Sequence, residues 1–148
     1  MVIIVPMGTL IHELGHAAAA LIAKADSVLL HIGTGKPFKT YVFNRLTIHL
    51  HSIFFIGGLT RSERKRTYNP KEKIWIALGG PLSNAIFVVL FILLFYPTHN
   101  PFIQLFLLFQ AWMLVINIIP FKWKGKKSDG YIIFQTLAEK KTNDTVNK

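Results

Sequence analysis

Three long apolar stretches constrain the fold of this 148-residue chain more than any other feature. They run from Val2 to Ala23, from Ile74 to Tyr96 and from Phe102 to Pro120. Each is long enough to cross the hydrocarbon core of a bilayer, about 30 Å thick, as a helix. Hydrophobic residues make up 51% of the chain and charged residues only 16%, a balance that is unusual in a soluble domain. The sequence therefore predicts an all-α polytopic membrane protein with three transmembrane helices, at about residues 2–24, 74–96 and 102–120.

The distribution of positive charge predicts how these helices are oriented. Nine Lys or Arg residues lie in residues 25–73 and seven in residues 121–148, whereas the connector at residues 97–100 has none. Under the positive-inside rule, we expect the N-terminus outside, and the basic loop and a tail at residues 131–148 in the cytoplasm, in a protein of the cell membrane. The basic cluster is typical of contacts with anionic lipid head groups, so we expect the lipid bilayer and no nucleic acid as its partner. Its members are Arg61, Arg64, Lys65 and Arg66.

A strand-like segment at residues 27–58 separates the first two apolar stretches. Residues 27–32 are apolar and β-prone, residues 33–37 are a turn cluster, and apolar and polar residues alternate from Arg45 to Phe55. The sequence thus predicts a small membrane-associated β segment. His49 and His51 would share one face of a strand, where they could either bind a second metal ion or form the polar face of a half-buried strand; the second reading is favoured because two ligands alone make a weak site.

The first apolar stretch contains the pattern His-Glu-x-x-His, made by His12, Glu13 and His16. Four residues are close to one helical turn, so both imidazoles lie on one helix face and can bind one metal ion. Glu13 would then lie beside the open coordination position. The alternative is a buried pair of hydrogen-bonded histidines, but ionisable residues in an apolar helix are costly unless something such as a metal compensates them. The pattern therefore favours a hydrolytic zinc site.

A catalytic zinc ion needs a third protein ligand, and the chain has no cysteine to provide a thiolate. Most of the remaining carboxylates lie in charged stretches, where solvation is their ordinary role. Asp129 is different, because it follows the third apolar stretch and Pro120, which should end that helix. Gly130 permits a tight turn that could direct the carboxylate back toward the bilayer. Asp129 is therefore the candidate third ligand.

Three motifs in order give the chain a resemblance to a known family. They are His-Glu-x-x-His at residues 12–16, Gly-Pro-x-x-Asn at residues 80–84, and Asn-x-x-Pro followed by Asp-Gly at residues 117–130. Together they resemble the site-2 protease family of intramembrane zinc metalloproteases, peptidase family M50. This chain differs in having Ser128 before Asp-Gly and a lysine-rich insertion after the proline, formed by Lys122, Lys124, Lys126 and Lys127.

The resemblance implies one intramembrane metalloprotease domain over residues 1–148, with one Zn²⁺ bound by His12, His16 and Asp129 and with Glu13 as the catalytic base. It also implies that Asn84 lies near the active site and assists substrate binding, for which donation of a hydrogen bond to the developing oxyanion is one candidate role. Its alternative role is helix packing. The expected activity is hydrolysis of a peptide bond in a transmembrane or signal-like peptide near the cytoplasmic side of the membrane.

Two alternatives belong to other classes of function. One is a catalytically silent homologue that binds and regulates membrane partners, which would have no need for Glu13. The other is a metal transporter, in which ionisable residues should be distributed over several spans. The second and third apolar stretches contain no charged residue. The sequence therefore favours the zinc endopeptidase.

Overall fold

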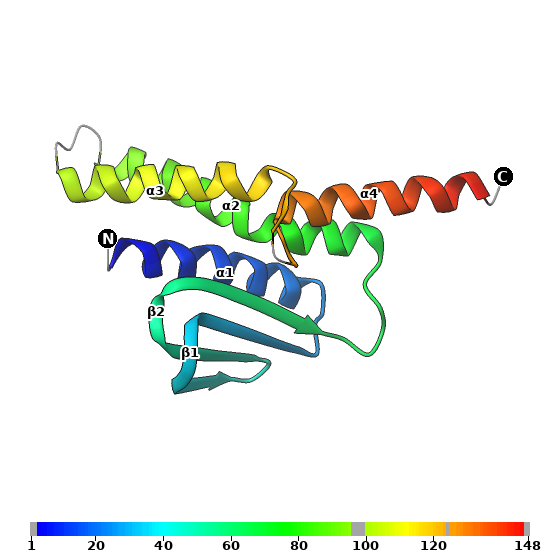
Figure 1. The fold of residues 1–148 in the computed structure, drawn as a ribbon, viewed down its shortest axis with the longest axis horizontal. Helices are drawn as coiled ribbons and strands as arrows, with labels where there is room; N and C mark the ends of the chain where they lie inside the picture. Colours follow the sequence, from blue (N-terminus) through cyan, green and yellow to red (C-terminus); the bar gives the residue numbers. More distant parts are fainter. Residues whose placement is uncertain (1–2, 96–99, 124, 147–148) are drawn as a thin grey trace.

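The computed structural model describes residues 3–95, 100–123 and 125–146. These residues form a helix, a pair of long strands, two further helices, a very short hairpin and a last helix. The elements are α1 (Ile4–Ile22), β1 (Ser27–Phe43), β2 (Leu46–Glu63), α2 (Pro70–Phe95), α3 (Pro101–Ile118), β3 (Lys122–Trp123), β4 (Lys126–Lys127) and α4 (Asp129–Val146). Figure 1 shows α1 between the β1–β2 sheet and a layer formed by α2, α3 and α4.

This arrangement contradicts the expected all-α protein with three membrane-spanning helices. Within the described residues there are four helices and two antiparallel sheets. Two helices, α2 and α3, are long and apolar enough to cross a membrane, and α1 is not among them. The polar residues of the His-Glu-x-x-His pattern lower the mean hydropathy of α1, and α1 is packed against protein on both sides. The predicted orientation depends on the connector at residues 97–100, which has no Lys or Arg. Residues 97–99 of this connector lie outside the described residues.

The β1–β2 sheet is larger than the strand-like segment predicted at residues 27–58, because β2 continues to Glu63. The expected turn at residues 33–37 is also wrong: β1 continues through it and bends at Gly33, whose φ is 85°. Both strands bend, so Val28 pairs with Ser62 on one side and with Leu46 on the other. The run from Val28 to Ile32 is therefore central in the sheet.

The small side chains of α1 allow close packing on two of its sides. Ala17 and Ala20 face the sheet, where they join a buried cluster with Ala25, Val28, Leu30 and Ile32. On the other side, a Cβ atom at Gly15 would meet the Gly79 carbonyl and the Ser83 hydroxyl of α2. Glycine at position 15 therefore lets the two helices approach until their backbones nearly touch, as small residues do in membrane bundles.

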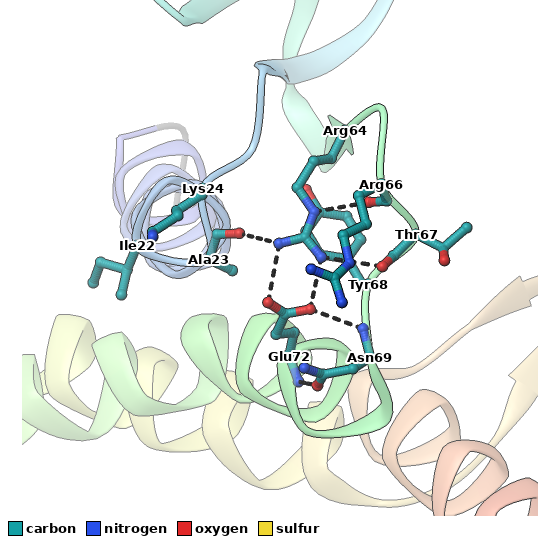
Figure 2. Close-up of a pocket in the computed structure, with 9 residues that line it drawn as sticks. All are labelled: Ile22, Ala23, Lys24, Arg64, Arg66, Thr67, Tyr68, Asn69 and Glu72. Carbon is teal, nitrogen blue, oxygen red and sulfur yellow. Dashed lines mark hydrogen bonds and ion pairs between the residues drawn. The ribbon is translucent and has the colours of Figure 1, made fainter.

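Arg64 ties the end of α1 to the start of α2 (Figure 2). Its guanidinium donates to the Ala23 carbonyl at 2.6 Å and to the Glu72 carboxylate at 3.0 and 2.7 Å. Glu72 in turn forms a capping box with Asn69, since each accepts a hydrogen bond from the backbone N–H of the other. These bonds fix where α2 begins relative to α1. The cavity beside them, about 580 Å³, includes none of the three candidate metal ligands in its lining.

Candidate metal centre

Three side chains that are far apart in sequence converge between α1 and the start of α4. His12 Nε2 lies 3.1 Å from His16 Nε2 and 3.2 Å from Asp129 Oδ2, and His16 Nε2 lies 3.3 Å from Asp129 Oδ1. Ligand atoms at about 2.0–2.1 Å from a tetrahedral zinc ion are about 3.3 Å from one another. The carboxylate approaches the two imidazoles through different oxygens, and each of the three separations is close to the distance between two ligand atoms of one zinc ion, so these residues form a group that could hold a metal ion.

The unsatisfied atoms of this group fit a cation. His12 is 4% exposed and Asp129 is 8% exposed, and the Oδ2 atom of Asp129 is buried with no hydrogen-bond partner in the described structure. A buried carboxylate oxygen without a partner is costly, because it has lost its hydration. A divalent ion between the three side chains would replace that hydration.

The backbone of α2 orients the two histidines. His16 Nδ1 donates to the Ile76 carbonyl at 2.8 Å, which leaves Nε2 unprotonated and directed at the other ligand atoms. Gly80 lies directly against both rings: a Cβ atom there would be 2.6 Å from His12 Cε1 and would also collide with His16 Nε2. Glycine at position 80 therefore leaves the space that the two imidazoles occupy.

Asn84 is fully buried, and its amide lies 3.1 Å from His12 Nδ1. Its Oδ1 atom is buried without a partner. If the amide is turned over, Oδ1 accepts the Nδ1 proton of His12, and His12 Nε2 is left free to bind a metal. Asn84 thus lies against the candidate ligand His12.

Asp129 reaches the histidines because the lysine-rich insertion folds back on itself. The insertion forms the β3–β4 hairpin, with Lys122 paired to Lys127 and Trp123 to Lys126. The hairpin returns the chain, so Ser128 N donates to the Phe121 carbonyl at 3.0 Å. The hairpin therefore lies outside the site and brings the chain back, so Asp129 lies close to the end of α3. Lys124 lies outside the described residues.

Ser128 and Gly130 fix the start of α4 next to Asp129. The Ser128 hydroxyl accepts from Tyr131 N at 3.1 Å, as an N-cap residue does, and donates to the Ile119 carbonyl at 2.7 Å. Gly130 lies in the first turn of α4 and not in the tight turn expected, and a Cβ atom there would collide with the Ile118 carbonyl. Glycine at position 130 thus permits the contact between α4 and the end of α3.

Glu13 lies beside the group on α1 and is 8% exposed. Its Oε2 atom accepts a hydrogen bond of 2.6 Å from the Thr60 hydroxyl on β2. This contact could not be predicted from the sequence, since Thr60 lies in a different element and 47 positions away.

The sheet has a separate histidine cluster, formed by His31, His49 and His51. His31 Nδ1 lies 3.0 Å from His51 Nε2, and the His31 and His49 rings stack at 5.0 Å. They are not brought to His12 and His16. Among the described residues, the group of His12, His16 and Asp129 is the one arranged to hold a metal ion.

A comparison with known families agrees with the motifs and their geometry. The family model described as peptidase family M50 matches residues 1–147. That match covers nearly the whole chain, including all three candidate ligands, Glu13 and Asn84. The chain belongs to peptidase family M50, the site-2 protease family.

Proposed function

We propose that this member of a membrane-associated metalloprotease family is a zinc-dependent endopeptidase that cleaves a membrane-embedded or signal-like peptide near the cytoplasmic side of the membrane. The observation that carries the proposal is the convergence of His12, His16 and Asp129 at separations of 3.1–3.3 Å, with Glu13 next to them on the same helix. A group built only to hold a metal would not need a carboxylate directly beside the ligands.

Each residue has a defined part in this proposal. The two neutral imidazoles and the Asp129 carboxylate would bind Zn²⁺, which supplies a Lewis acid that polarises a carbonyl and makes water more acidic. Glu13 would take the proton of the attacking water and pass it to the leaving amine. Asn84 would hold the His12 ring in place and remains a candidate hydrogen-bond donor to the substrate.

The sheet offers a place for an extended substrate. Residues 46–50 of β2 have strand partners on both sides in the structure and so present no free edge. The run from Gly58 to Ser62 pairs on one side only within the described residues, with residues 28–32. It is also the run that contacts Glu13. A peptide unwound alongside this run would lie near the candidate base.

Comparison of the wild-type chain with Glu13→Gln tests the proposal. Each form is co-expressed in the same cells with a panel of tagged single-span membrane peptides, and new peptide termini are identified by mass spectrometry. Glu13→Gln should retain zinc but lower cleavage at least about 100-fold, because a general base contributes about 10² to 10⁴ in rate. The same termini at the same yield with both forms would contradict the proposal and favour a catalytically silent homologue.

A further inference from the structure

The last run of β2 lies directly against the side chain of Glu13. Thr60 Oγ1 is 2.6 Å from Glu13 Oε2 and 3.1 Å from the Glu13 carbonyl oxygen. A hydroxyl has one hydrogen to donate, and a charged carboxylate at 2.6 Å is a stronger acceptor than a neutral carbonyl at 3.1 Å. The Thr60 hydrogen therefore goes to Oε2.

Gly58, two positions earlier on the same strand, lies against the rest of the Glu13 side chain. A Cβ atom at Gly58 would be 2.6 Å from Glu13 Cγ and 2.9 Å from Oε1. The strand thus contacts one carboxylate oxygen through a hydroxyl and presents bare backbone to the other. Within the described part of the chain, Oε1 has no hydrogen-bond partner and is not fully buried.

We propose that Thr60 is a positioning residue that holds Oε2 of Glu13 and so leaves Oε1 as the oxygen that takes the proton from water. This inference rests on the proposed peptidase activity. Thr60 does not itself exchange a proton in the reaction. It restricts the side-chain rotation of Glu13, and a base that is held in its working orientation does not lose rate to unproductive rotamers.

The strand is a firm support for this hydroxyl. Thr60 pairs with Leu30, which is fully buried in the cluster between the sheet and α1. The sheet and the helix that carries Glu13 are therefore packed together through one core, and the Thr60–Glu13 contact crosses between them. This places the sheet in the catalytic machinery as well as in the fold.

Three variants test the role of the hydroxyl. Thr60→Val keeps the shape of the side chain and removes its hydrogen bond, Thr60→Ser restores the hydroxyl, and Thr40→Val is the matched control. The Thr40 hydroxyl bonds to His49 Nδ1 at 2.9 Å in the same sheet but has no contact with Glu13. The substrate is a peptide from the panel that wild type cleaves, reconstituted with the purified protein.

Thr60→Val should lower kcat at least about 10-fold, the size expected for a hydrogen bond to a charged group, with KM and zinc content unchanged. Thr60→Ser should recover most of the lost kcat, and Thr40→Val should match wild type. Cleavage by Thr60→Val at the wild-type kcat, or an equal loss in Thr60→Ser, would overturn the inference while leaving the proposed function intact.

A second measurement does not depend on turnover. In a double-mutant cycle of Tm, Glu13→Ala and Thr60→Val should not be additive: removing the hydroxyl leaves a buried carboxylate without its donor, and removing both groups relieves that cost. Additive changes in Tm would overturn the contact. Absence of cleavage by wild type across the whole panel would instead count against the proposed function, and the inference about Thr60 would fall with it.

Discussion

The Ser128 hydroxyl donates a 2.7 Å hydrogen bond to the carbonyl of Ile119 across the base of the lysine-rich hairpin. The same hydroxyl accepts from Phe121 N at 3.0 Å and from Tyr131 N at 3.1 Å. One small side chain therefore joins the end of α3, the start of β3 and the first turn of α4, and Asp129 is the next residue. The position of a candidate metal ligand depends on this junction.

Ser128→Ala should loosen the junction and weaken zinc binding. The loss of a helix N-cap costs about 0.5–2 kcal/mol, and Asp129 would no longer be held at the histidines. We expect a lower Tm and a raised Kd for zinc, measured by competition with a chelator. Ser52→Ala is the control, because the Ser52 hydroxyl bonds only to the exposed Lys36 carbonyl. A Ser128→Ala protein with wild-type zinc affinity would show that the junction does not place Asp129.

His12→Ala and His16→Ala should each remove the zinc from the purified protein, which in wild type should be about one ion per chain. Metal content is measured by mass spectrometry after purification in detergent. His51→Ala, from the separate cluster of the sheet, should keep its zinc. The opposite pattern, with zinc lost in His51→Ala and kept in both other variants, would place the metal in the sheet.

Asp129→Ala should weaken zinc binding and abolish cleavage, because two imidazoles alone leave the ion with two open positions. Glu139→Ala changes another acidic side chain of α4, one that is exposed and bonds to Gln135. It should alter neither property. Unchanged zinc affinity in Asp129→Ala would mean that another group completes the coordination shell.

The histidine cluster of the sheet should make the protein less stable in mild acid. Burial lowers the pKa of His31, and the neighbouring His49, His51 and Arg61 lower it further. Because the pKa is lower in the folded state than the unfolded value of 6.5, the unfolded state binds the proton more readily. The contribution of the neutral His31 ring to the free energy of unfolding is therefore fully present above pH 6.5. It is lost as the pH falls below that value.

We expect Tm to fall between pH 7.5 and 5.5, and to fall less in His31→Gln, as measured by thermal unfolding in detergent. An identical decline in the variant would assign the acid sensitivity to other groups.

The sequence predicted that His12, His16 and Asp129 come together, but it predicted the fold around them less well. His12 and His16 are one helical turn apart, so their convergence follows from local geometry, and Asp129 was singled out by the proline and glycine around it. The hydroxyl of Thr60 and the carbonyl of Ile76 could not be predicted in this way. They reach α1 through packing of distant elements, for which a single sequence has no periodic signal.

The errors in the fold have equally specific causes. The length of the apolar run from Val2 to Ala23 predicts a membrane span, but its small side chains allow close packing against α2 and the sheet. The glycines at positions 33 and 35 predict a turn, but they lie within a strand that bends and continues. Ser128 is an ordinary N-cap residue, and it could have indicated the start of α4 from the sequence.

The candidate ligands come from the first and last helices of the described structure, and this has a consequence for the order of synthesis. A ribosome releases His12 and His16 long before Asp129, so a nascent chain has two of the three ligands throughout most of its translation. The third arrives only when the β3–β4 hairpin has closed and α4 has begun. If the site works as proposed, the chain stays inactive during its synthesis until Asp129 joins the two histidines, so assembly of the last helix is itself the step that switches the site on.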